Sequence, residues 1–248
     1  MSGRATVMSV EPLLLTADLV GVFAFAVSGN LLAARKNVDI LGSLVLGMAV
    51  GLGGGIMRDV ILGQIPASLE APYYLIPPLV STILVYFLGQ RSHLARGPIV
   101  AFDALGLGVF VTTGTTIGLA AGVPTASAIL LGVLTGVGGG MIRDVLVNEI
   151  PAVFNASDLY ILPAVTGAGF TAIVWHLGWY GPGWTVGIAV FVFAFRMLAW
   201  WFEWRVPLPM RRWSYRSVRV PTVFRRTSDG EHARRRSAGV FAPRRRNR

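Results

Sequence analysis

Two arginine–aspartate pairs stand inside apolar sequence, and their side chains are the main candidates for contacting an ion or a charged substrate. Arg58-Asp59 and Arg143-Asp144 each follow three consecutive glycines within the same ten-residue pattern. Charged side chains at membrane depth are costly, so they tend to mark ion or substrate pathways. The competing interpretation is a structural ion-pair network that holds the protein together. The two roles are compatible, and both stay open at this point.

The pattern occurs twice because a longer unit is duplicated, and such internal repeats predict architecture. Residues 51–67 and 136–152 lie 85 positions apart, and 10 of the 17 residues are identical. The same offset relates Asp18 to Asp103, which are further candidate partners for the arginines. Neighbours on a helix point about 100° apart. We therefore expect each arginine to pair with an acid of the other repeat.

The glycines before each pair allow two interpretations. Their i, i+4, i+8 spacing lets helices approach closely. Three in succession also weaken a helix by about 1 kcal/mol each, which predicts a bend or break in mid-helix. A broken helix lining a watery cavity would present its dipoles and carbonyls to an ion. The residues that we predict to line an ion or substrate pathway are Gly53, Gly54, Gly55, Arg58, Asp59, Gly138, Gly139, Gly140, Arg143, Asp144, Asp18 and Asp103.

Hydroxyl side chains accompany these residues and could also line a hydrophilic path. More often, such hydroxyls bond back to a carbonyl of their own helix. They are Ser28, Thr112, Thr113, Thr115 and Thr116.

The elements that position these residues are predicted to be membrane-spanning helices. The chain of 248 residues is 54% hydrophobic and only 14% charged, whereas soluble domains carry about 25% charged residues. A spanning helix needs about 20 mostly apolar residues. Seven segments qualify, at residues 12–34, 39–63, 73–91, 98–121, 125–148, 158–178 and 182–204. We predict an all-α membrane protein with seven transmembrane helices.

The duplicated unit contains three of these segments, and an odd number decides its topology. A three-helix unit starts and ends on opposite sides of the bilayer, so its copy must insert upside down. We predict two inverted three-helix repeats followed by a seventh helix. The predicted divisions are 1–11 (N-terminal segment), 12–94 (first repeat), 97–179 (second repeat), 182–204 (seventh helix) and 205–248 (tail).

Basic residues predict the orientation in the membrane. In the seven-helix arrangement, Arg35, Lys36, Arg91, Arg96 and the tail fall on one side. Because cytoplasmic loops carry an excess of Lys and Arg, we expect the C-terminus in the cytoplasm and the N-terminus outside, in the inner (plasma) membrane.

The tail differs from the rest of the chain in charge. Residues 205–248 hold 14 arginines and two acids, a net charge of +12 against +10 for the whole chain, which leaves −2 for residues 1–204. We expect a disordered, cytoplasmic tail that could bind anionic lipid, and no nucleic acid partner. Nearer the seventh helix, Arg196 precedes Trp200, Trp201 and Trp204, and we expect it to snorkel to the membrane interface.

Several function classes lack their sequence signatures. The chain has no cysteine, so disulfide frameworks and thiolate metal sites are excluded. The glycine patterns match neither a dinucleotide-binding fingerprint nor a phosphate-binding loop. The three histidines have no metal-ligand spacing, and no nucleophile–base pair is apparent. We predict that the protein is not an enzyme and has no cofactor or metal.

Two repeats carrying Gly-Gly-Gly-x-x-Arg-Asp and Ile-Pro-Ala, plus a seventh helix, resemble the prokaryotic trimeric intracellular cation channel (TRIC) family. In bacteria, the shared domain is also labelled a glycine transporter domain. The resemblance covers about residues 12–204. It implies a homotrimer with a pore in each protomer, lined by the second and fifth helices, bent at their glycines, and passing potassium and other monovalent cations.

The motif leaves the transported species open. Some bacterial members of the family are regarded as glycine uptake proteins, and the repeated motif does not separate them from the channels. Potassium or glycine is therefore the expected substrate, with a glycine uptake transporter using the same midplane site as the alternative to a channel. The lysine-containing motif of the animal members is absent, so their regulation is not implied.

Overall fold

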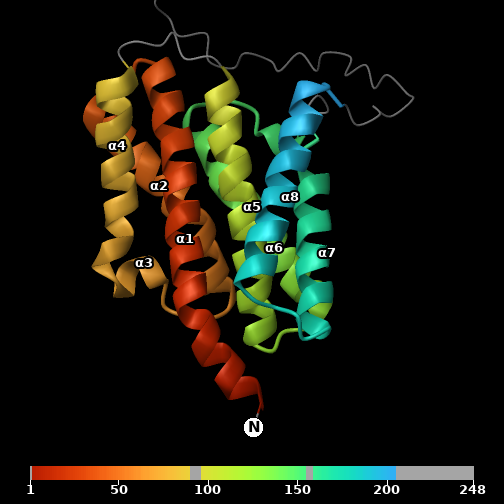
Figure 1. Ribbon diagram of the computed structural model, residues 1–248. Helices are drawn as coiled ribbons and strands as arrows, with labels where there is room; N and C mark the ends of the chain where they lie inside the picture. The colour runs from red at the N-terminus through yellow and green to blue at the C-terminus, as the bar shows by residue number, and fades with distance from the viewer. Residues whose placement is uncertain (1, 90–95, 155–158, 205–248) are drawn as a thin grey trace, which may run out of the picture. The chain divides into compact units, whose positions relative to one another are not determined.

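The computed structural model describes residues 2–89, 96–154 and 159–204, and within these ranges the chain is helical and contains no strand. Figure 1 shows the long helices running side by side in one bundle. The helices are α1 (Ser2–Arg35), α2 (Ile40–Ile61), α3 (Ala67–Glu70), α4 (Ile76–Gly89), α5 (Arg96–Ala120), α6 (Thr125–Leu146), α7 (Ile161–His176) and α8 (Pro182–Trp201), with 3-10 turns η1 (Pro72–Leu75) and η2 (Ala152–Phe154).

Each of the seven predicted segments overlaps one helix of 14 residues or more, and α3 is an additional short turn of helix. Five helices in the described part of the chain are long and apolar enough to cross a membrane: α1 from Pro12, α2, α5, α6 and α8. Two further apolar helical segments, Pro72–Phe87 and Ile161–His176, are shorter. The protein is therefore an all-helical membrane protein. The number of spans and the inversion of the repeats stay predictions.

Turn residues that lie 85 positions apart also have the same backbone conformation. Asn37 after α1 and Gly122 after α5 have φ of 57° and 78°, and Gly63 after α2 and Asn148 after α6 have φ of 69° and 58°. Helices commonly end in this left-handed conformation, which glycine adopts freely and asparagine tolerates. The two repeats therefore end corresponding helices in the same way.

Helix α5 lies at the centre of the bundle. It packs against α1, α6, α7 and α8, and Figure 1 shows it between α1 and α8. The core around it contains Phe25, Val50, Leu107 and Phe110, all fully or almost fully buried. Helices α4, α7 and α8 instead expose large apolar side chains to the outside, as expected of surfaces that face lipid or another protomer.

The glycine-rich helices α2 and α6 are continuous, so a break at their glycines is wrong, while a bend there stays a prediction. These helices cross closely at the glycines. A Cβ added at Gly139 would lie 2.7 Å from the carbonyl oxygen of Val50, and one added at Gly54 would collide with the carbonyl oxygen of Thr135. Burial by neighbouring helices compensates for the weak helix propensity. The close-packing interpretation explains these two positions.

Candidate functional site

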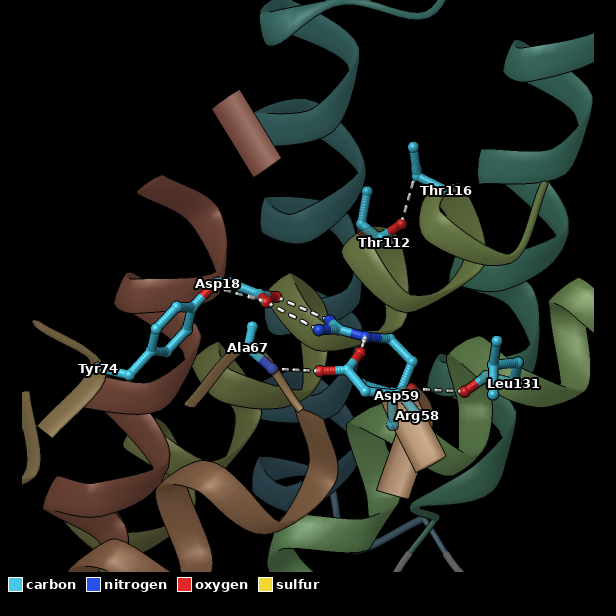
Figure 2. A network of polar contacts seen from close by, with 9 residues as sticks. Asp18, Arg58, Asp59, Ala67, Tyr74, Thr112, Thr116 and Leu131 are labelled. Carbon is cyan, nitrogen blue, oxygen red and sulfur yellow. Dashed lines mark hydrogen bonds and ion pairs between the residues drawn. The ribbon is translucent and has the colours of Figure 1, made fainter. Parts of the chain in front are cut away.

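The first buried ion-pair cluster joins α1 to α2. Arg58 donates from Nη1 and Nη2 to the two carboxylate oxygens of Asp18, at 3.0 and 3.1 Å, and from Nε to Asp59 at 2.8 Å. The three side chains are at most 7% exposed. Figure 2 shows the guanidinium facing the Asp18 carboxylate. A two-pronged pairing of this kind fixes both partners in position.

The second cluster joins α5 to α6 in the same way. Arg143 donates from Nη1 to Asp103 at 2.7 Å and from Nε to Asp144 at 2.9 Å. Its Nη1 also donates to the Ser28 hydroxyl at 2.6 Å. Ser28 belongs to α1, so this contact crosses from one repeat to the other.

The second oxygen of each motif aspartate holds the start of the following segment. Asp59 Oδ2 accepts the backbone N–H of Ala67 at 3.0 Å, and Asp144 Oδ2 accepts that of Ala152 at 2.9 Å. Both alanines belong to the repeated Ile-Pro-Ala. The aspartate therefore links the arginine to the loop, which explains why the two sequence motifs occur together.

The predicted pairing of each arginine with an acid of the other repeat is wrong. Both arginines pair with aspartates of their own repeat. The guanidinium carries donors on two edges, so Nε reaches the adjacent aspartate while the Nη atoms reach the neighbouring helix. The angle between adjacent positions on a helix therefore does not prevent Arg58 and Asp59 from meeting.

The last glycine of each motif faces its cluster. A Cβ added at Gly140 would lie 2.7 Å from the Tyr160 hydroxyl and 3.1 Å from Asp103 Oδ1, whereas the nearest atom to one at Gly55 is Arg58 Nη2 at 3.9 Å. The first glycines of each triplet, Gly53 and Gly138, instead face apolar side chains of the opposite glycine-rich helix. Gly140 therefore has less room for a side chain than Gly55.

The predicted hydroxyl groups differ in their hydrogen-bond partners. Thr112, Thr115 and Thr116 donate to carbonyls of their own helix at 2.8 Å, and Figure 2 shows the bond between Thr112 and Thr116. Ser28 accepts from Arg143 and donates to the carbonyl of Ile99 at 3.1 Å. The hydroxyl of Thr113, which the repeat relates to Ser28, is buried and has no partner among the described residues.

Two tyrosines complete the clusters, and neither is among the predicted site residues. Tyr74 donates to Asp18 at 3.4 Å. Tyr160 lies beside Asp103 and Gly140 and beneath Arg196, whose Cζ is 4.7 Å from the ring centroid. The repeat offset relates Tyr74 to residue 159, one position short of Tyr160, so an alignment without gaps does not match them.

Arg196 of α8 does not snorkel to the interface as predicted. Its side chain is buried, with the residue 2% exposed, because it extends inwards over the Tyr160 ring. Its Nε and Nη1 have no hydrogen-bond partner among the described residues. Stacking on an aromatic face partly compensates for such burial.

The two clusters differ in the space around them. Arg143, Asp103 and Asp144 line a cavity of about 400 Å³. The cavity beside Arg58 and Asp18 measures only about 10 Å³. The larger cavity is also lined by Arg35, Lys36, Arg96, Arg196 and Glu149, of which Lys36 and Glu149 form an exposed ion pair at 2.5 Å. Among the described residues, no group of three His, Asp or Glu side chains is arranged to hold a metal ion.

Comparison with known proteins places this chain in a family. A family model described as "Glycine transporter" matches residues 15–90 and 100–176, one block within each predicted repeat. The chain is 40% identical over 206 residues to the UPF0126 membrane protein SCO4104 of Streptomyces coelicolor, covering 82% of this chain and 94% of the relative. It is 38% identical over 152 residues to the inner membrane protein YadS of Escherichia coli, covering 60% and 73%.

Solved structures agree with the sequence relatives. The TRIC trimeric intracellular cation channel orthologue from Rhodobacter sphaeroides superposes with a TM-score of 0.72 at 30% identity, covering 77% of this chain and 98% of that one. A prokaryotic TRIC channel solved in 0.5 M KCl gives a TM-score of 0.71 at 29% identity, covering 79% and 100%. The chain belongs to the prokaryotic TRIC family of membrane proteins, whose bacterial members share the glycine transporter domain.

Proposed function

We propose that the protein is a potassium-permeable channel for monovalent cations, with one pathway through each protomer. The observation that carries this proposal is the composition of the buried clusters. The first cluster combines one arginine with two aspartates, a net charge of −1, inside a bundle of apolar helices. The second has the same three groups, with the buried Arg196 nearby over Tyr160. A buried negative charge favours a cation at membrane depth. The structural likeness to TRIC cation channels supports the same function.

The proposed pathway runs along α2 and α6, past both clusters. Each helix contributes its glycine triplet and its Arg-Asp pair, while α1 and α5 contribute Asp18 and Asp103. The helices form two inverted three-helix repeats, residues 12–94 and 97–179, followed by α8. In this topology the N-terminus is outside the cell, and the tail, which lies outside the described residues, is cytoplasmic and available to anionic lipid.

We propose a homotrimer as the assembly. The Rhodobacter sphaeroides relative is named a trimeric channel. In this chain, large apolar side chains such as Phe87, Trp179 and Trp201 are more than half exposed, which leaves apolar surface for lipid and for neighbouring protomers. Cross-linking of the purified protein followed by mass determination tests the assembly, and a monomer or dimer alone contradicts it.

Uptake of glycine is the second candidate, and the larger cavity favours it. The cavity brings Arg196, with unpartnered Nε and Nη1, into the same space as Asp103 and Asp144. A guanidinium can bind a carboxylate, and carboxylates can bind an ammonium. The opposite charges of a small zwitterionic amino acid match this arrangement.

Reconstitution into liposomes separates the two functions. A potassium gradient is followed with a potential-sensitive dye, and uptake of labelled glycine is measured in parallel. We expect rapid potassium flux that does not saturate, without glycine uptake. Saturable glycine uptake without potassium leak would replace the channel by the carrier.

The arginines of the clusters provide a site-directed test. We expect Arg58→Ala and Arg143→Ala to impair transport while the protein still reaches the membrane, because each leaves two buried carboxylates without their shared partner. Arg58→Lys and Arg143→Lys are matched controls that retain the charge but lose the two-pronged geometry. Unchanged flux in the normally expressed alanine variants would assign the arginines a structural role only.

A further inference from the structure

Two phenylalanines meet at the centre of the bundle. Phe25 of α1 and Phe110 of α5 are related by the 85-residue offset. They are 0% and 1% exposed, and their ring centroids are 5.4 Å apart with an interplanar angle of 51°. The two residues are therefore equivalent by the repeat and also in direct contact with each other.

Each ring occupies a slot made by two glycines. Phe110 fits against Gly21 of α1 and Gly54 of α2, and Phe25 fits against Gly106 of α5 and Gly139 of α6. A Cβ at Gly106 would lie 2.6 Å from the Phe25 ring, and one at Gly54 would lie 3.2 Å from the Phe110 ring. The slots are also related by the offset. Each ring is therefore inserted between the glycines of the other repeat.

The aromatic pair lies between the two charged clusters. Along α1, Phe25 is between Asp18 of the first cluster and Ser28, which contacts Arg143 of the second. Ten residues of helix place these two contacts about 15 Å apart. Phe110 lines the small cavity of the first cluster. On the pathway proposed above along α2 and α6, an ion moving from one cluster to the other would pass the rings, because they lie against Gly54 of α2 and Gly139 of α6.

We propose that the Phe25–Phe110 pair is the hydrophobic barrier that closes the pathway between the two clusters. An apolar constriction without space for water blocks ions by remaining dry, and it conducts once it widens enough to be wetted. The two rings fill the centre of the bundle from opposite sides, so displacing either ring opens the barrier. The proposal rests on the channel function proposed above.

The test is potassium flux through liposomes containing Phe25→Ala, Phe110→Ala or the double variant. Each truncation removes an aromatic ring from the constriction and so widens it. We expect flux to rise by roughly tenfold or more in the double variant, because the constriction becomes wetted. The matched control is Phe170→Ala with Phe191→Ala. That pair has ring centroids 5.3 Å apart on α7 and α8, but both residues are at least 40% exposed, and we expect unchanged flux.

The outcomes separate the barrier from the channel function. Higher flux in the Phe25 and Phe110 variants than in the wild type, with the control unchanged, supports the barrier. Equal potassium flux in the wild type and the double variant overturns the barrier and leaves the channel standing. No potassium flux in any of these proteins, with saturable glycine uptake intact, overturns the channel function on which the barrier rests.

A conservative pair of variants keeps the test decisive if alanine prevents folding. Phe25→Leu and Phe110→Leu replace the ring by a smaller apolar side chain, which disturbs the packing less than alanine does. We expect folded protein with flux between the wild-type and alanine levels. Folded leucine variants with wild-type flux overturn the barrier.

Discussion

Replacing Asp59 by alanine tests whether the motif aspartate organises the fold around its arginine. The Asp59 carboxylate accepts from Arg58 Nε at 2.8 Å and from the Ala67 backbone N–H at 3.0 Å, and it is 7% exposed. Asp59→Ala therefore removes an ion-pair partner and leaves a partly buried N–H of the chain without its acceptor. Asp18 retains its two bonds to Arg58, so the guanidinium keeps one counter-charge.

The expected destabilisation follows from these two losses. Breaking a buried ion pair costs about 3–5 kcal/mol, and an unsatisfied buried N–H costs about 1–3 kcal/mol. Because Asp18 remains in place, we take the low end of both ranges, about 4 kcal/mol in total. In a protein of this size, each kcal/mol lowers Tm by roughly 2–4 °C, so the expected fall is roughly 8–16 °C.

The measurement is thermal unfolding of the purified protein in detergent, with Asp39→Ala as the matched control. Asp39 begins the same helix, where its exposed side chain caps the N–H of Gly42 at 2.7 Å. Losing such a cap costs about 1 kcal/mol, or roughly 2–4 °C. Asp144→Ala is expected to lower Tm in the same way, since the Asp144 carboxylate also accepts from its motif arginine and from a backbone N–H. A fall for Asp59→Ala no larger than for Asp39→Ala would refute the organising role.

Two further predictions concern the backbone. Gly139→Ala is expected to lower Tm, because its Cβ would lie 2.7 Å from the Val50 carbonyl oxygen. A Cβ added at Gly187 on α8 would have no other heavy atom within 4 Å. Gly187→Ala is therefore expected to stabilise the helix by up to about 1 kcal/mol. Equal effects on the melting curves would contradict the close-crossing interpretation. Asn148 has a φ of 58°. Replacing it by glycine should leave Tm unchanged, whereas Asn148→Val should lower the free energy of unfolding by about 1–2 kcal/mol. Tolerance of valine would contradict the left-handed turn.

The fold was predictable because the repeat and the hydrophobic segments are strong sequence signals. All seven predicted segments overlap helices, five of them long enough to cross a membrane, and the segment predicted at residues 98–121 is observed as α5 at Arg96–Ala120. The offset of 85 also identifies equivalent residues that meet in space. Phe25 and Phe110 could have been found in this way. Apolar residues inside apolar segments give no sequence signal of their own, so only a position-by-position comparison of the repeats identifies them.

The residues of the ion-pair clusters were predictable, but their pairings were not. Asp18 and Asp103 do contact the arginines, yet sequence spacing alone does not show which helices are adjacent. The glycines suggested a broken helix because propensity was considered without tertiary packing, which supplies the missing stability through the crossing of α2 and α6. Arg196 could not be placed either, since its partner Tyr160 is a ring and not an acid.

One difference between the two clusters comes from the part of the chain that is not repeated. Both clusters have an arginine, two aspartates and a tyrosine in equivalent surroundings, and a perfect duplication would give them equal cavities. Helix α8 lies against α5 and α7 and brings Arg196 and Trp200 into the lining of the larger cavity. The first repeat has no such neighbour in the described part of the chain. The seventh helix therefore gives the two clusters different neighbours, and only the second cluster lies beside a cavity of about 400 Å³ in the described part of the chain.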